Sequence, residues 1–120
     1  MDVSFKPDGG PLRIQARSRH MQPAVFSLFL WAKGDVKPTE LGGGVLLDGE
    51  AQTIQPELTA VDYNGTMIQA VVTVSLLNGK RYAPEVQILQ DDAVIGADDV
   101  DKSTTRNSIG VQFLFLMKGA

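Results

Sequence analysis

The chain has 120 residues, a formal net charge of −3, 43% hydrophobic residues and no cysteine. This length fits one domain, 1–120, and the lack of cysteine excludes a disulfide framework, cysteine metal sites and a thiol nucleophile. The acidic balance argues against general nucleic-acid binding, so we expect no nucleic-acid partner.

The first ten residues, MDVSFKPDGG, contain no basic segment followed by an apolar one, so we predict no signal peptide. The longest apolar run, 24–32, is about half as long as a membrane-spanning helix needs. We therefore expect a soluble protein, intracellular or virion-associated, with no membrane partner.

Apolar and polar residues alternate along most of the chain, which is the pattern of half-buried β-strands. The predicted strands, in chain order, are 2–7, 11–19, 24–33, 44–48, 52–62, 66–77, 80–90, 93–96 and 108–118. Short strands separated by turn residues are typical of a sandwich or barrel. We predict an all-β protein, an antiparallel β-sandwich of about eight or nine strands, jelly roll or immunoglobulin-like, with little or no helix.

Segment 11–19 alternates apolar residues with Arg13, Arg17 and Arg19, so the three arginines share one face. Segment 85–101 holds six acidic residues and no basic one. The arginine face is either a solvated face crossed by carboxylates of neighbouring strands, or a contact with the acidic segment of another subunit, or an anion site. Nucleic acid is disfavoured as the bound anion, because this strand has no aromatic residue for stacking on the bases.

Segments 24–33 and 108–118 carry apolar residues on both faces, whereas a strand of a two-sheet sandwich needs only one apolar face. An uncovered second face would be a contiguous apolar patch, which monomers rarely expose. Either the loop 33–44 or the loop 96–107 folds over it, or it is a subunit interface. The predicted interaction surface combines these outward-facing apolar residues with the arginines: Val25, Phe29, Trp31, Leu114, Leu116, Arg13, Arg17 and Arg19.

The run VQFLFLM at 111–117 has a second implication. Segments of this kind pair with other chains when they lie at an open sheet edge. We expect it to lie inside a sheet or to be closed by a partner strand.

Two Asn-Gly pairs, at 64–65 and 78–79, predict three-residue hairpin loops that would join 52–62, 66–77 and 80–90 into one meander. A left-handed backbone conformation is expected at Gly65. Pro84 lacks an N–H group, so the strand 80–90 is predicted to be an edge strand or to carry a bulge there.

Few residues offer chemistry. His20 is the one histidine and has no nucleophile motif nearby, so we predict a surface turn residue and no enzyme. The five aspartates of 91–101 lack the EF-hand spacing, and a solvated acidic turn is a commoner outcome than a calcium site. We expect no cofactor and no metal.

These observations favour a non-enzymatic structural or interaction module that forms a homo-oligomer or docks on a larger assembly, for example as a virion shell, cement, capsid-decoration or tail component. The alternative is a β-sandwich that binds a small ligand, carbohydrate or lipid. The few exposed aromatic residues expected argue against a sugar site.

Overall fold

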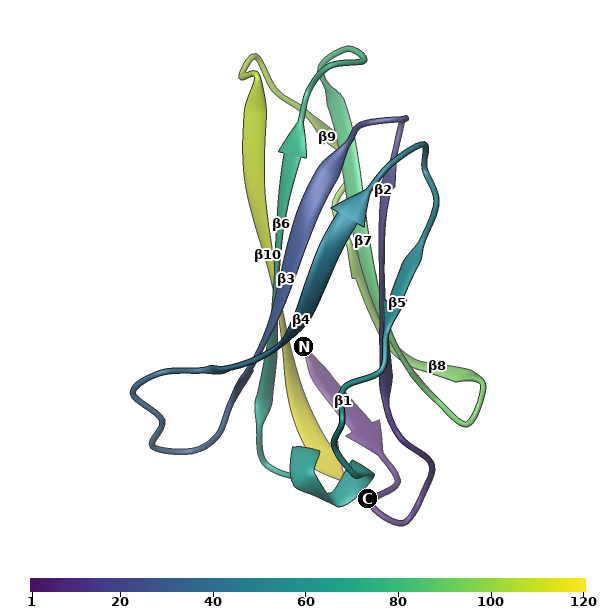
Figure 1. The fold of residues 1–120 in the computed structure, drawn as a ribbon, viewed down its shortest axis with the longest axis vertical. Helices are drawn as coiled ribbons and strands as arrows, with labels where there is room; N and C mark the ends of the chain where they lie inside the picture. The colour runs from purple at the N-terminus through teal and green to yellow at the C-terminus, as the bar shows by residue number, and fades with distance from the viewer.

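A computed structural model describes all 120 residues and places them in two packed β-sheets (Figure 1). The molecule measures 44 × 32 × 21 Å. The strands are β1 (Asp2–Phe5), β2 (Arg13–Arg19), β3 (Ala24–Trp31), β4 (Thr39–Leu46), β5 (Gln52–Ile54), β6 (Met67–Ser75), β7 (Arg81–Gln90), β8 (Ala93–Asp99), β9 (Lys102–Ser103) and β10 (Ser108–Gly119). One short 3-10 helix, η1 (Ala60–Tyr63), precedes β6. The predicted all-β sandwich with little helix is thus confirmed.

Sheet A has the order β1-β10-β6-β3-β4, and sheet B the order β5-β2-β7-β8, with β9 beside β7. All pairs are antiparallel except β1 and β10, which run parallel from Asp2↔Leu116 to Phe5↔Gly119. The first and last strands of the chain therefore lie side by side.

A single core of 23 buried residues lies between the sheets. It follows the alternation of the sequence, because one face of each long strand points inward: Ile68, Ala70 and Val72 of β6 are fully buried, as is Phe115 of β10. The remaining side chains of these strands point outward.

The predicted meander of 52–90 is wrong. Strand β5 pairs with β2, β6 pairs with β3 and β10, and β6 and β7 lie in different sheets. Gly65 and Gly79 do adopt positive φ, at 74° and 94°, but the Asn-Gly turns lead the chain out of one element and into another layer. The two-residue hairpin of this chain is Asp91-Asp92 between β7 and β8, with φ values of 50° and 62°.

Two buried glutamines explain why the chain crosses between the sheets. The Gln22 amide donates to the carbonyls of Asn78, Gly79 and Arg81 at 2.9–3.2 Å and accepts from the Asn78 N–H. At the other end of the molecule Gln90 makes three such bonds to Lys6 and Gly10. Each amide satisfies the backbone of an arch that no strand ladder reaches.

Three further predictions need correction. Residues 39–43, expected to be loop, belong to β4, and Lys102–Ser103, also expected to be loop, form β9. Strand β7 is an inner strand, not an edge. Pro84 is tolerated there because its missing N–H faces the interruption between β8 and β9, where its carbonyl accepts from Val100.

Candidate interaction surface

The outer face of sheet A is largely apolar. Its apolar residues, hereafter the A face, come from four neighbouring strands: Val25, Phe29 and Trp31 of β3, Val45 of β4, Met67 and Val71 of β6, and Leu114 and Leu116 of β10. The register sets them in rows, with Trp31, Met67 and Leu116 in one row. The five apolar residues predicted for the interaction surface thus lie together on one face.

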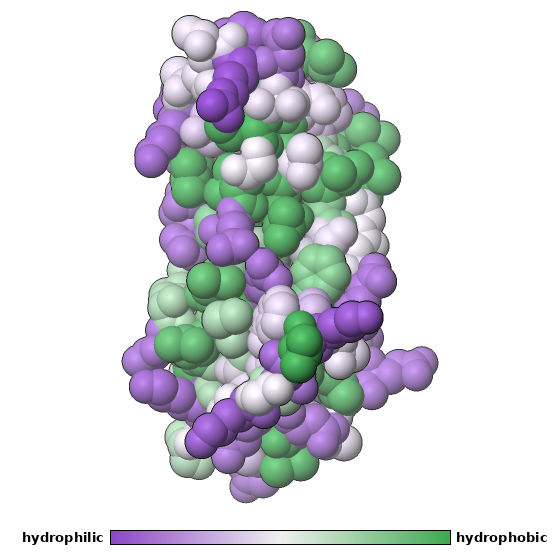
Figure 2. Space-filling view, turned by 90° about the vertical axis from the view of Figure 1, so that its left-hand side faces the viewer, coloured by the Kyte–Doolittle hydropathy of each residue, from purple (hydrophilic) through white to green (hydrophobic).

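The A face is exposed. Val25 is 52% exposed, Val45 54% and Leu116 45%, whereas Phe29 and Trp31 are half-buried. Figure 2 shows apolar side chains gathered over this side of the molecule, interrupted by polar ones.

Neither loop considered as a cover seals the A face. The β3–β4 connection stands out from the sheet in Figure 1, and its residue Val36 is 91% exposed. The segment 96–107 belongs largely to sheet B, through β8 and β9. Covering this face therefore requires something other than these two loops.

A line of polar contacts crosses the A face. The Trp31 indole N–H donates to Gln69 Oε1 at 2.9 Å, and the Gln69 amide donates to Gln112 Oε1 at 2.8 Å. The line links β3, β6 and β10 and fixes the orientation of the Trp31 ring. The sequence analysis missed it, although the glutamines at outward positions of two strands were its signal.

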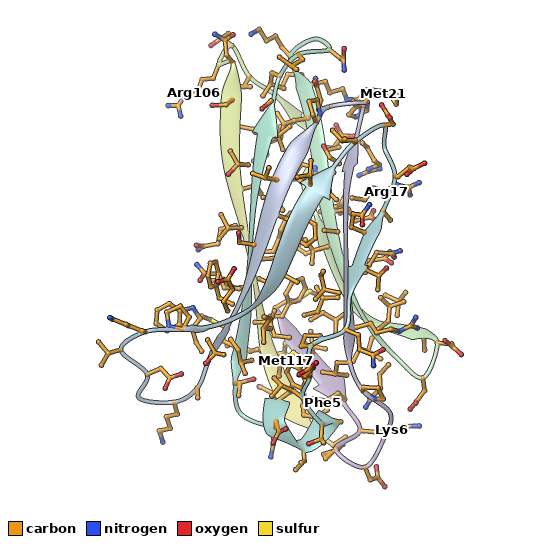
Figure 3. All side chains as sticks on the ribbon, viewed as in Figure 1. Phe5, Lys6, Arg17, Met21, Arg106 and Met117 are labelled. Atoms are coloured by element: carbon orange, nitrogen blue, oxygen red, sulfur yellow. The ribbon has the colours of Figure 1, made fainter.

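The outer face of sheet B, hereafter the B face, carries the three predicted arginines. Arg13 pairs with Asp92 at 3.1 Å and Arg19 with Asp99 at 3.0 Å, while the Arg17 guanidinium donates to the Gly49 carbonyl. Two of the three arginines therefore meet carboxylates of the acidic segment of the same chain. The sandwich separates them from the A face, and Figure 3 shows Arg17 on the side of the molecule away from β10.

A further ionic cluster lies at one end of the B face. Arg81 donates two hydrogen bonds to Asp101, at 2.8 and 3.0 Å, and the His20 ring contacts the same carboxylate at 3.3 Å. The hydrogen bond from Arg81 holds the pKa of Asp101 below its usual value and raises the pKa of Arg81. His20 thus lies in a turn, with φ 61°, beside a carboxylate but without a nucleophile contact.

No group of three or more His, Asp or Glu side chains has a geometry that holds a metal ion. Asp92, Asp99 and Asp101 of the acidic segment contact arginines, and Asp91 accepts a hydrogen bond from the Gly10 N–H. No helix is long and apolar enough to cross a membrane.

One cavity of about 380 Å³ opens at the base of the sandwich, between β1, the β7–β8 hairpin and the end of the chain. Four of its eight lining residues are apolar, Phe5, Ala93, Ile95 and Ala120, and the others are Ser4, Lys6, Gln90 and Asp91. Its volume lies within the range of small-ligand sites. No sequence pattern indicates this cavity, because its walls come from three segments that are distant in the chain.

These features define a class, a two-sheet β-sandwich with one apolar and one ionic outer face. No family model matches the sequence, and no curated protein matches it. The chain is similar to the crystal structure of a domain of unknown function, DUF4425, from Bacteroides vulgatus, with a TM-score of 0.53, 16% identity, and coverage of 92% of this chain and 96% of that chain.

A second similar structure is the NMR structure of the calcium-bound form of a protein from Parabacteroides distasonis, with a TM-score of 0.41, 11% identity, and coverage of 91% of this chain and 94% of that chain. At 16% identity, the similarity to the Bacteroides vulgatus domain shows the fold alone.

Proposed function

We propose that this protein is a non-enzymatic interaction module that associates through the A face, with a second copy of itself or with a subunit of a larger assembly. The observation that supports it is an apolar face of eight residues on four strands that no segment of the chain covers. Contiguous apolar patches of this kind mark protein contacts more often than they occur on free monomers.

The free energy gained by burying the A face determines how stable the complex can be. Full burial of a large apolar side chain is worth about 1.5–3 kcal/mol, so covering these half-exposed side chains contributes roughly 1 kcal/mol each. Association itself costs about 4–15 kcal/mol in lost freedom of motion. The A face alone therefore supports a weak, concentration-dependent complex, and a stable one needs further contacts.

The arginines are a smaller part of this proposal. Arg13 and Arg19 are each paired with a carboxylate of their own chain, so a partner would have to displace those contacts. A virion shell, cement or tail component stays a proposal within this class, since a weak self-associating sandwich suits a particle with many copies.

Replacing Leu116 by lysine tests the A face, because it places a charge in the apolar row, beside Met67. We expect light scattering to show oligomers of the wild type that grow with concentration, and a shift of Leu116→Lys toward monomer. Ala97→Lys, at an exposed position of β8 on the B face, is the matched control and should associate like the wild type. A wild-type chain that stays monomeric at millimolar concentration contradicts the proposal.

The cavity at the base supports the alternative of a small-ligand site. Its apolar walls and the Lys6 ammonium suit a fatty-acid tail and carboxylate, while its one aromatic residue, Phe5, is buried in the wall and offers no sugar platform. Calorimetric titration with lauric acid and with maltose separates the two ligand classes. Heat from lauric acid that Lys6→Glu abolishes supports a lipid site; no heat from either probe removes this alternative.

A further inference from the structure

Strand β10 has a partner on only part of one side. Strand β6 pairs with it from Ser108 to Leu116, but β1 covers only Leu116–Gly119 on the other side. The Met1 ammonium donates to the Leu114 carbonyl, and the Leu116 N–H donates to the Met1 carbonyl. The segment Ser108–Gln112, hereafter the open edge, has no strand on the side away from β6, as the free upper half of β10 shows in Figure 1.

The direction of the unpaired groups follows from the strand geometry. Backbone N–H and C=O groups alternate between the two sides of a strand. The Leu114 carbonyl and the Leu116 N–H, which bond Met1, point away from β6. Because every second residue points to the same side, the backbone groups of Ser108, Gly110 and Gln112 also point away from β6. The open edge thus presents three residues with donors and acceptors in register for another strand.

The other edges of the two sheets carry the features that natural proteins use against such pairing. Strand β4 has a register shift and Glu40, β5 has three residues, and β8 has a register shift and two aspartates. From Ser108 to Met117, β10 has no charge, no proline and no register shift. Its half beyond β1 is the regular, unprotected edge of this molecule.

The charges at its ends bound the usable length. Arg106 lies beyond Ser108 at one end, where Figure 3 shows it at the end of β10, and the Met1 ammonium lies at Leu114 at the other. The five residues of the open edge, which lie between these two charges, are uncharged. An antiparallel copy of the same segment, centred on Gly110, opposes uncharged residues only.

The side chains fit that arrangement. Ile109 and Val111 are partly buried against the core and would oppose each other across the dyad, a favourable β-branched pair. Gly110 would oppose Gly110, and a Cβ placed there meets no atom within 4 Å, so the position also accepts a side chain on the outer face. Ser108 would oppose Gln112, whose amide can bond its hydroxyl.

We propose that two copies of this chain join at the open edge, β10 to β10, in a symmetric antiparallel pair centred on Gly110. The two five-stranded sheets A then become one continuous sheet, and the two A faces merge into one larger apolar surface. The proposal deepens the interaction function proposed above and rests on it for the fate of that surface.

Gln112→Pro tests the edge directly. It removes an N–H that points away from β6, so the ladder within the chain stays intact and only the partner loses a bond. We expect sedimentation to show a dimer at least ten-fold weaker than that of the wild type. Gln112→Ala, which loses the side chain and keeps the N–H, should stay within about three-fold, since backbone groups make the pairing.

A second measurement does not depend on the proline variant folding. The chain has no cysteine, so a single Gly110→Cys can form a disulfide only between copies. In the proposed dimer the two Gly110 residues form a hydrogen-bonded antiparallel pair. The Cα atoms of such a pair lie about 5.5 Å apart, which is within disulfide range. Thr73→Cys is the matched control, because Thr73 is exposed in the same row but lies on the inner strand β6. We expect Gly110→Cys to cross-link at least ten-fold faster under mild oxidation.

The outcomes separate this inference from the proposed function. Equal cross-linking rates of the two cysteine variants, or equal dimer strength of Gln112→Pro and the wild type, overturn the edge pairing. If Leu116→Lys still weakens association in that case, the A-face function stands alone. If Gln112→Pro weakens the dimer and Leu116→Lys does not, the edge pairing stands and the A-face function fails.

Discussion

The two outer faces of the sandwich are built by the same alternation and have opposite chemistry. The A face carries aliphatic and aromatic side chains and one line of neutral amides. The B face carries three arginines, two of which pair with aspartates of the β7–β8 turn and of β8. A polar outward residue needs only water or a local partner, whereas an apolar one stays unsatisfied until another molecule covers it. The A face, and not the charged strand β2, is therefore the surface whose burial against another molecule would be favourable.

The largest effect is expected when a buried and an exposed residue of β10 are each replaced by alanine. Phe115 is fully buried and Leu116, its neighbour, is half exposed. Phe115→Ala should lower the free energy of unfolding by about 3–5 kcal/mol, because it leaves a cavity in the core. Leu116→Ala should cost about 1 kcal/mol or less in the monomer, since much of its surface is already in water. Urea unfolding at low protein concentration measures both. Equal losses would mean that the two faces are equally buried.

The ion pairs of the B face should contribute much less. A double-mutant cycle on Arg19 and Asp99, with each residue changed to alanine, should give a coupling of about 0.2–1 kcal/mol, because both side chains are partly solvated. The coupling should fall in 1 M salt, and none of the three variants should change the oligomeric state. Dissociation of the oligomer by Arg19→Ala would instead place the B face in the interface.

The smallest expected effect concerns pH. The hydrogen bonds from Arg81 depress the pKa of Asp101 in the folded chain. The stabilisation from these hydrogen bonds is present above a pH of ~3.9, the pKa of an aspartate in the unfolded chain. It is lost as the pH falls through the lower pKa that Asp101 has in the folded chain. Asp101→Asn should therefore flatten the decline of the melting temperature below about pH 4. An unchanged acid limb would show that this exposed pair adds nothing measurable.

Much of the fold could be predicted from the alternation of residues, because a period of two both identifies strands and assigns their inner face. Strands β2, β3, β6, β7 and β10 fall within or almost within their predicted segments. The pairing of the strands could not be predicted. The glycines of the two Asn-Gly turns have the positive φ of a hairpin turn, but the segments on either side of each turn do not pair with each other. The structure uses those turns as arches between sheets, and the arch at Asn78 depends on the buried Gln22, which is distant in sequence.

The β3 and β10 residues of the A face could be predicted, since they follow from excess apolar residues on those two strands, whereas Val45, Met67 and Val71 were not predicted. The position of the A face opposite the arginines could not be predicted, because the assignment of strands to sheets was unknown. The cavity and the open edge also escaped prediction. Both depend on where short strands begin and end, and no local pattern records that β1 begins beside Leu116 and stops at Phe5.

The parallel pairing of β1 with β10 has a consequence for the response of the molecule to tension. The chain begins beside Leu114 and ends beyond Gly119, where the Ala120 N–H bonds the Phe5 carbonyl (Figure 1). A force that pulls the two ends apart therefore slides β1 along β10 and loads their hydrogen bonds together, not one after another. Under a force applied to its two ends, the sandwich should unfold in one abrupt step, and the β1–β10 pair should be the first to separate.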